Sequence, residues 1–257
     1  MISAAEIQRS LRTKVFGQAL HTFDVVESTN NVAKKLAESG APEGTTVIAE
    51  YQTAGRGRFN RRWHGERGKN LLFSLLLRPE ESRLASLVTY LAANCAAEAV
   101  EEHTGKRVEC KWPNDLLING RKFCGILLES AWQESKVEYL ILGIGMNVNE
   151  DSFPPELRKT ATSLKLECEG DIDRVLILRT FLQCLESSYL QSKVDGYDGI
   201  LEAWKARCPM LGREISVEQS GRKLTGRAIQ LDPDGALVIE NDHRKVRIFA
   251  GDVTVIG

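Results

Sequence analysis

Residues 47–77 read V-I-A-E-Y-Q-T-A-G-R-G-R-F-N-R-R-W-H-G-E-R-G-K-N-L-L-F-S-L-L-L. Val47 to Tyr51 and the nearly continuous apolar run Leu71 to Leu77 predict two strands of a buried sheet. The segment between them, Gly55 to Asn70, carries six Lys and Arg residues and four glycines against a single acid, Glu66. Since these cations repel one another, we expect a loop that is mobile when empty and ordered when it binds an anion.

Glycine lets backbone N–H groups approach a ligand, and arginine donor forks fit phosphate or carboxylate oxygens. The basic loop therefore suits a nucleotide phosphate or a nucleic-acid backbone, with a solvated surface loop as the plain alternative. The whole chain carries 34 basic and 35 acidic residues, a formal charge of -1. This balance weighs against nucleic-acid binding, because the positive charge is local.

The 257 residues can form one large domain and one small one. The sequence contains no apolar run of membrane-spanning length and no apolar signal-peptide core, so we expect a cytoplasmic protein without a membrane partner. The six cysteines form no C-x-x-C pair and are expected to be reduced, mostly buried residues. The four histidines are scattered, so we expect no metal site built from protein nitrogen and sulfur ligands.

Periodicity predicts an α/β (α+β) fold with a mixed central sheet and flanking helices. Ile7, Leu11 and Val15 suggest a short N-terminal helix, and 82–103 is the clearest helix in the chain. Cap residues at Ser28 to Asn30 begin another helix. Further strands are expected at 21–26, 108–112, 116–118, 123–130 and 137–144, and further helices at 172–190 and 200–208.

From about Leu211 onward, five short apolar alternations are separated by turn residues, which predicts a small five-stranded barrel. We therefore place the domain boundary between residues 1–209 and 210–257.

Two further motifs concentrate polar residues. The stretch K-W-P-N-D, Lys111 to Asp115, precedes a hairpin at Asn119-Gly120, and Pro113 restricts Trp112 to an extended backbone. Its plain alternative is a strand end with a surface lysine and a buried tryptophan. The stretch G-I-G-M-N, Gly143 to Asn147, is a weak glycine signal that lacks the third glycine of a dinucleotide fingerprint.

The order of these motifs resembles the biotin protein ligases, over roughly residues 20–257. The residues that carry the resemblance are S-T-N (28–30), E-Y-Q-T-A-G-R-G-R (50–58) with Trp63, K-W-P-N-D (111–115), R-K-F-C-G-I-L-L-E (121–129) and G-I-G-M-N (143–147). The resemblance implies an enzyme that joins biotin to ATP, with Mg²⁺, as biotinyl-5′-AMP. Biotin then passes to a lysine of a biotin carboxyl carrier protein, usually that of acetyl-CoA carboxylase. It also implies a C-terminal SH3-like β-barrel and allows a homodimer.

By the same resemblance, Ser28, Thr29, Asn30 and Gln52 hold the polar ureido head of biotin, for which buried hydroxyl and amide partners are needed. Arginines of the loop and Lys111 meet the carboxylate and phosphate groups of the reactants. The catalytic residues implied are Lys111, Arg58, Arg56 and Asp115, and the binding residues are Ser28, Thr29, Asn30, Gln52, Gly55, Arg56, Gly57, Arg58, Arg61, Trp63, Lys111, Asn114, Lys122, Gly125 and Asn147.

Several of these roles stay open. Asp115 is the nearest candidate for a base in the second step, but it could equally orient Lys111 or a metal-bound water. Trp63 is expected to pack on adenine or to support the loop, and Asn147 to lie near ribose and phosphate. Lys122, Gly125 and Glu129 align with the motif around the biotin pocket, where a glycine leaves room for the ligand.

The chain departs from the family pattern at two places. Many relatives have Arg-Gly where this chain has Phe59-Asn60, and we expect Asn60 to take the left-handed backbone of that glycine. The 20 residues ahead of the first strand are too few for the winged helix-turn-helix of repressor members, so no DNA-binding repressor function is expected. The alternatives are a lipoate or octanoate attachment enzyme and a nucleic-acid-binding regulator that uses the basic loop.

Overall fold

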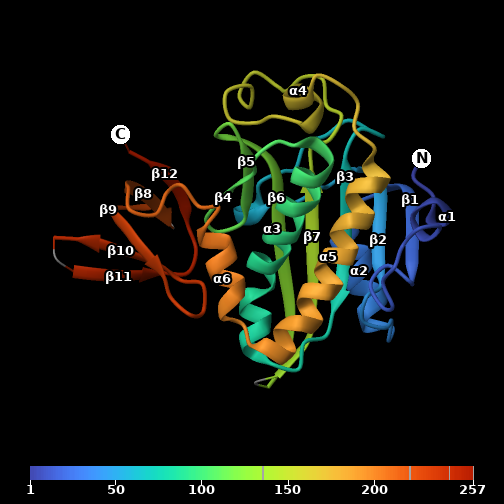
Figure 1. Ribbon diagram of the computed structural model, residues 1–257, viewed down its shortest axis with the longest axis horizontal. Coiled ribbons are helices and arrows are strands. Elements are labelled where there is room, and N and C mark those ends of the chain that lie inside the picture. Colours follow the sequence, from blue (N-terminus) through green and yellow to red (C-terminus); the bar gives the residue numbers. More distant parts are fainter. Residues whose placement is uncertain (135, 220, 243, 257) are drawn as a thin grey trace.

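A seven-stranded mixed sheet forms the centre of the larger domain in the computed structural model, which describes residues 1–134, 136–219, 221–242 and 244–256 (Figure 1). The strand order is β1-β2-β3-β7-β6-β5-β4; β1 and β2 are parallel, and the other neighbours are antiparallel. The strands are β1 (Leu20–Val26), β2 (Thr46–Gln52), β3 (Leu71–Leu77), β4 (Glu109–Lys111), β5 (Asp115–Ile118), β6 (Arg121–Gln133) and β7 (Lys136–Met146). The expected α/β class is confirmed.

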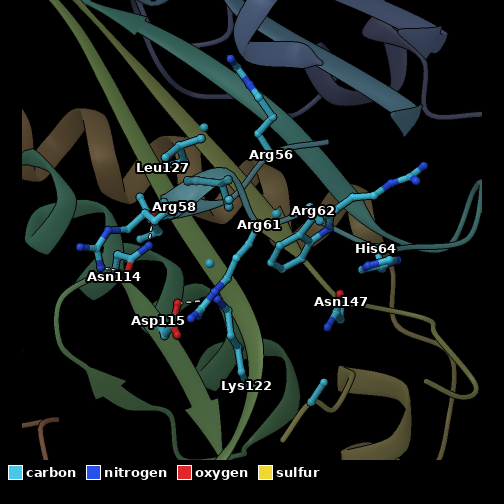
Figure 2. Close-up of a pocket in the computed structure, with 18 of the residues that line it drawn as sticks. Arg56, Arg58, Arg61, Arg62, His64, Asn114, Asp115, Lys122, Leu127 and Asn147 are labelled. Carbon is cyan, nitrogen blue, oxygen red and sulfur yellow. Dashed lines mark hydrogen bonds and ion pairs between the residues drawn. The ribbon is translucent and has the colours of Figure 1, made fainter. Parts of the chain in front are cut away.

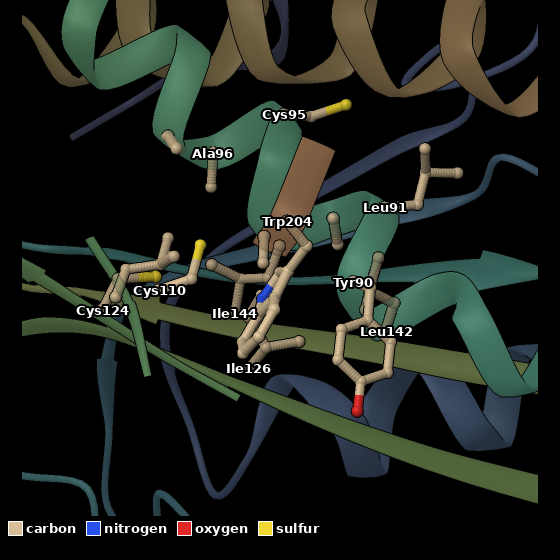
Figure 3. Packing of buried hydrophobic residues seen from close by; sticks show 14 of the residues in the cluster. Tyr90, Leu91, Cys95, Ala96, Cys110, Cys124, Ile126, Leu142, Ile144 and Trp204 are labelled. Carbon is tan, nitrogen blue, oxygen red and sulfur yellow. The ribbon is translucent and has the colours of Figure 1, made fainter. Parts of the chain in front are cut away.

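Helices cover both faces of this sheet. On one face lies α2 (Thr29–Glu38), whose Ala33 and Ala37 pack on Val47 and Leu76. The opposite face carries the larger apolar core, where buried residues of α3 meet the sheet and Trp204 (Figure 3). The helices on that face are α3 (Ser82–Thr104), α5 (Arg174–Asp195) and α6 (Asp198–Lys205).

The C-terminal segment forms a second, five-stranded antiparallel sheet with the order β11-β10-β9-β8-β12. It confirms the expected small β domain; Gly257, the last residue of the expected range, lies outside the described residues. Its strands are β8 (Glu214–Gln219), β9 (Arg222–Leu231), β10 (Leu237–Asn241), β11 (Arg244–Ile248) and β12 (Asp252–Val255).

Gly235 joins the two domains. Its carbonyl accepts hydrogen bonds from the Tyr90 hydroxyl (2.6 Å) and from Trp112 Nε1 (3.1 Å), and both side chains are buried in the larger domain. The tryptophan of K-W-P-N-D is therefore buried, as its plain interpretation held, and it also anchors the C-terminal domain. As a result, one edge of the C-terminal domain lies beside the lysine of the same motif.

Several sequence expectations were wrong at element ends. The N-terminal helix α1 (Ala4–Gln8) stops well before Val15. The chain turns back instead, because the backbone N–H groups of Lys14, Val15 and Phe16 donate to the buried Glu186 carboxylate at 2.6–2.8 Å. Two short helices, η1 (Arg58–Asn60) and α4 (Leu164–Cys168), were not expected, and the helix expected to reach residue 208 ends at Lys205.

Among the described non-glycine residues of the basic loop, Phe59 has the left-handed backbone, with φ 54° and ψ 37°, and not Asn60 as expected. The Arg58 guanidinium lies 4.8 Å from the centre of the Phe59 ring. A non-glycine residue in this region carries backbone strain, which the surrounding loop contacts must hold in place.

Replacing Gly235 with alanine should weaken the docking of the C-terminal domain. A Cβ at this position would lie 2.4 Å from Tyr90 Cε2, and Gly235 also has φ +84°. Gly212→Ala is a matched control, because Gly212 has φ +83° but open space around the added Cβ. Both variants incur the left-handed backbone penalty, but only Gly235→Ala adds overpacking of about 1–3 kcal/mol. Urea denaturation that shows equal losses in the two variants would contradict this.

Candidate active site

A cavity of about 470 Å³ lies between the central sheet, the basic loop and the C-terminal domain (Figure 2). Six basic side chains line it, against two acids, Asp115 and Asp252. The basic residues are Arg56, Arg58, Arg61, Arg62, Lys111 and Lys122. This excess of positive charge in a recess suits an anionic ligand.

The neutral wall of the cavity comes from the start of α2 and the end of β2. Ser28, Thr29 and Asn30 are almost fully buried although they are polar. Ser28 occupies the N-cap position, but its side chain makes no capping hydrogen bond, so the capping interpretation of this hydroxyl is wrong. The Thr29 backbone N–H donates instead to Gln52 Oε1 at 2.7 Å, which fixes that oxygen as the acceptor.

Arg58 and Arg61 connect the loop to the C-terminal domain. The Arg58 guanidinium donates to Asn114 Oδ1 (3.2 Å) and to the Gly251 carbonyl (3.4 Å), and Arg61 pairs with Asp252. Burial lowers the pKa of Arg58 below its ordinary value, while the carboxylates of Asp252 and Asp115 oppose this shift. A desolvated guanidinium of this kind gains from an anionic ligand.

Lys111 and Asp115 face each other at the β4–β5 hairpin, where they are register partners. Asp115 binds Lys122 at 2.5 Å, and within the described residues Lys111 Nζ has neither an ion-pair nor a hydrogen-bond partner. The structure therefore does not show the option that Asp115 orients Lys111. The ammonium of Lys111 is available to a ligand.

Trp63 lies on a floor made by two glycines. A Cβ at Gly145 would be 2.6 Å from Trp63 Cε2, and one at Gly125 would be 3.1 Å from Trp63 Cζ3. Lys122 Nζ lies 5.7 Å from the indole, within cation–π range. Trp63 Nε1 is buried and has no partner among the described residues. Such an orphan donor on a cavity wall suits a ligand acceptor.

Asn147 follows β7 and offers a second orphan atom. Its Nδ2 donates to the Thr162 carbonyl at 3.1 Å, while Oδ1 is buried without a partner in the described chain. The segment that includes Thr162 runs beside β6, because Lys122 N–H donates to the Thr160 carbonyl. Its side chains Phe153, Leu157, Thr160 and Ala161 line the cavity.

All of the expected site residues except Gly55 line this one cavity. Gly55 instead leaves room for two residues of the cavity wall, because a Cβ there would lie 3.2 Å from both Gln52 Nε2 and the Trp63 carbonyl oxygen. The Arg56 guanidinium is held by Glu129 and Asn31 and points away from Asp115 (Figure 2). Arg56 thus lines the cavity without facing the cluster of other cations.

Sequence reasoning missed Asp252, the 153–161 segment and the glycine floor under Trp63. Nothing local in the C-terminal strands singles out Asp252, since it acts across 191 residues. The sequence does mark one further residue. Ser74 is the single polar residue in the apolar run L-L-F-S-L-L-L, and in the structure it is fully buried.

Two family models match the chain: the biotin/lipoate A/B protein ligase family over residues 22–147, and the biotin protein ligase C-terminal domain over 210–255. The chain is 38% identical to the bifunctional ligase/repressor BirA of Bacillus subtilis, over 98% of this chain and 78% of that protein. It is 32% identical to the biotin–[acetyl-CoA-carboxylase] ligase of Paracoccus denitrificans, over 88% of this chain and 96% of that protein. The chain belongs to the biotin protein ligases.

The fold agrees with this family. The solved structure of the biotin protein ligase from Aquifex aeolicus in complex with biotin and ATP has a TM-score of 0.79 at 30% identity, and covers 93% of this chain and 99% of that one. This biotin protein ligase is therefore an enzyme of biotin ligation. Of its described helices, none combines the length and apolarity needed to cross a membrane.

The glycine floor can be tested with Gly145→Ala. The added Cβ overlaps the indole, so Trp63 should leave its buried place and tryptophan emission should shift to the red. Gly199→Ala is the control, because its Cβ meets open space. The shift should vanish in a Trp63→Phe background; a shift that persists there would come from another tryptophan.

The ion pairs of Asp151, one of them with Lys69 at the end of the basic loop, should make the stability of the fold depend on pH in the acid range. Hydrogen bonds from Lys69 and Lys165 lower the pKa of Asp151 to about 2. The contribution of Asp151 to the free energy of unfolding is therefore fully present above its unfolded-state pKa of about 3.9. It is lost as the pH falls from there toward about 2. The Tm gap between wild type and Asp151→Asn should be constant above about pH 4 and narrow below it.

Asp195→Asn is the control for this series, because Asp195 is exposed and accepts from Gln191 and not from a cation. A gap for Asp151→Asn that widens on acidification would contradict the assigned sign.

Proposed function

We propose that this enzyme activates biotin with ATP as biotinyl-5′-AMP and transfers the biotinyl group to a lysine of a biotin carboxyl carrier protein of the acetyl-CoA carboxylase type. One observation carries the proposal: a single cavity combines a buried, neutral polar wall at Ser28, Thr29, Asn30 and Gln52 with six basic side chains. Biotin has the same two ends, an uncharged ureido ring and a carboxylate. The structural relative with biotin and ATP bound supports both ligands.

In the first step, a biotin carboxylate oxygen attacks the α-phosphorus of ATP, and the bond to pyrophosphate breaks. Two anions must meet, so cations that converge on the reacting atoms lower the barrier by electrostatic stabilisation and by positioning. Lys111 fits this role because its ammonium has no partner in the described chain, and Arg58 fits it because burial strengthens its need for an anion. Arg61 would exchange Asp252 for a phosphate oxygen.

Mg²⁺, which ATP chemistry implies, would add positive charge at the phosphates. Among the described residues no group of three or more His, Cys, Asp or Glu side chains could hold a metal, and Asp115 and Asp252 are already paired with cations. This donor set fits an ion that the nucleotide phosphates would carry, without a dedicated protein site among the described residues.

In the second step, the neutral amine of the target lysine attacks the acyl carbonyl, AMP leaves with the bonding electrons, and the amine loses a proton. Asp115 is the carboxylate of the K-W-P-N-D motif at the cavity, so we propose it as the group that accepts this proton. Its ion pair with Lys122 would have to open for this. Asn147 Oδ1 and Trp63 Nε1 are the unsatisfied atoms available to the nucleoside part.

We propose residues 1–209 as the catalytic unit and 210–257 as a unit that closes the cavity, since Gly251 and Asp252 hold loop arginines. We assign no repressor function to this chain, because its charge is balanced and six of its basic side chains line the cavity. Salt-sensitive, sequence-selective DNA binding would contradict this assignment.

The reaction is tested by biotin-dependent exchange of pyrophosphate into ATP and by labelling of a carrier domain. Wild-type protein should do both. If folded protein does neither, the proposed function is wrong. If lipoate replaces biotin in a competition titration, the enzyme belongs with the lipoate branch of the matched family.

Lys111→Ala should keep the fold and depress pyrophosphate exchange by about 10²–10³-fold, because one preorganised charge stabiliser is lost. Lys34→Ala is the control, since Lys34 is an exposed residue of α2 whose ion-pair partner in the described part of the chain is Glu38. Near-normal exchange by Lys111→Ala would reject its role as a charge stabiliser.

A further inference from the structure

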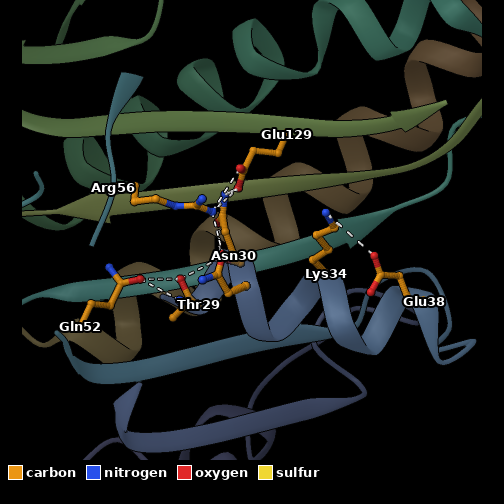
Figure 4. A network of polar contacts seen from close by, with 9 residues as sticks. Thr29, Asn30, Lys34, Glu38, Gln52, Arg56 and Glu129 are labelled. Carbon is orange, nitrogen blue, oxygen red and sulfur yellow. Dashed lines mark hydrogen bonds and ion pairs between the residues drawn. The ribbon is translucent and has the colours of Figure 1, made fainter. Parts of the chain in front are cut away.

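Glu129 lies on β6 behind the cavity wall and is not among the residues that line the cavity. Its carboxylate nevertheless accepts hydrogen bonds from two residues that line the cavity, Asn30 and Arg56. Asn30 Nδ2 donates to Glu129 Oε2 at 2.5 Å, and Arg56 Nη2 lies 3.1 and 3.2 Å from the two carboxylate oxygens (Figure 4). One carboxylate therefore joins the neutral wall to the start of the basic loop.

The other end of the Asn30 amide is fixed as well. The hydroxyl of the buried Ser74 on β3 lies 2.6 Å from Asn30 Oδ1 and 2.8 Å from Thr29 Oγ1. A carboxylate only accepts hydrogen bonds, so it must face Nδ2, and Oδ1 is left to Ser74. Glu129 thus decides which way the Asn30 amide points.

Gly143 provides the space for this arrangement. Ser74 is the register partner of Gly143 on β7, and Glu129 pairs with Ile141 of the same strand. A Cβ at Gly143 would lie only 2.1 Å from Asn30 Oδ1. The first glycine of G-I-G-M-N is therefore required by a side chain of this protein, and the Asn30 amide spans β7 between its two partners.

Gln52 belongs to the same hydrogen-bond network through Thr29. Thr29 donates to Gln52 Oε1 through its backbone N–H (2.7 Å) and its hydroxyl (3.2 Å). Since Oε1 accepts from the protein, the Gln52 amide nitrogen is turned the other way, toward Gly55. The Asn30 amide is thus oriented by Glu129 and Ser74, and the Gln52 amide by the backbone N–H of Thr29.

The Glu129–Arg56 pair contributes little to stability by its position. Its side chains are 41% and 42% exposed, and an exposed ion pair typically contributes about 0–1 kcal/mol. Loss of the charge on Glu129, with an acceptor for Asn30 kept, should therefore change Tm little, so that an effect on the loop can be separated from unfolding.

We propose that Glu129 is a positioning residue that orients the Asn30 amide for the head group of the substrate and ties Arg56, so that the neutral wall and the basic loop form one unit. This rests on the proposed function for the identity of the head group, biotin. It assigns Arg56 a loop-holding role in place of a direct role at the reacting phosphate.

The test uses steady-state pyrophosphate exchange by the full chain. Glu129→Ala should raise KM for biotin about tenfold, with kcat and KM for ATP within about threefold of wild type at a temperature where the variant is fully folded. Asp24→Ala is the matched control: it breaks the Asp24–Arg67 pair of the same loop, with side chains 48% and 58% exposed, and neither residue lines the cavity. It should leave all three kinetic constants near wild type.

Two further variants separate orientation from charge. Glu129→Gln keeps an acceptor for Asn30 but loses the charge that holds Arg56. It should restore KM for biotin toward wild type while trypsin cleaves after Arg56 faster than in wild type. Ser74→Ala should also raise KM for biotin, and the Glu129→Ala/Ser74→Ala pair should lose less than the product of the single effects, because both act through one amide.

Equal changes in KM for biotin and ATP, an effect of Asp24→Ala as large as that of Glu129→Ala, or multiplicative single effects would overturn the proposal. If wild type shows no biotin-dependent exchange, the proposed function fails, while the tryptic cleavage still tests the tie to Arg56. Unchanged cleavage in Glu129→Gln would overturn that tie by itself.

Discussion

Charge neutralisation of the basic loop is the constraint on which the site depends. Six cations within sixteen residues have one local acid, so carboxylates must come from elsewhere in the chain. The structure supplies them from β1, β6, β12 and the segment after β7, each paired with a different cation. The pairs are Arg67–Asp24, Arg56–Glu129, Arg61–Asp252 and Lys69–Asp151. The loop can lie over the sheet because these acids surround it.

These pairs are mostly exposed, and each adds little stability. They hold the loop to different elements, and the two whose arginines line the cavity, Arg56–Glu129 and Arg61–Asp252, are the ones that bear on the site. Arg58 differs because it is desolvated and bound to neutral partners, Asn114 and the Gly251 carbonyl. Arg58 is thus the loop cation that would gain most from an anionic ligand, and it lies where the reactant phosphate is proposed to bind.

The glycines of β7 leave room over the sheet for two side chains of the site. Gly143 admits the Asn30 amide, and Gly145, with Gly125 on β6, admits the Trp63 indole. A weak G-x-G signal in the sequence therefore holds two side chains of the protein over the sheet. Neither glycine opens a helix at a nucleotide phosphate, which agrees with the missing third glycine of a dinucleotide motif.

Elements with their own periodic pattern were predictable from the sequence: the 82–104 helix, the apolar strand Leu71–Leu77 and the five strands of the small domain. The order of motifs also indicated the family, and of the residues expected at the site all but Gly55 line one cavity. Features that depend on partners distant in sequence were not predictable. The N-terminal helix ends at Gln8, the backbone around Val15 donates to Glu186 instead, and Asp252 enters the site from 191 residues away. Hydrophobic periodicity is local, whereas an ion pair or a bound backbone leaves no periodic trace, so only the packed chain reveals them.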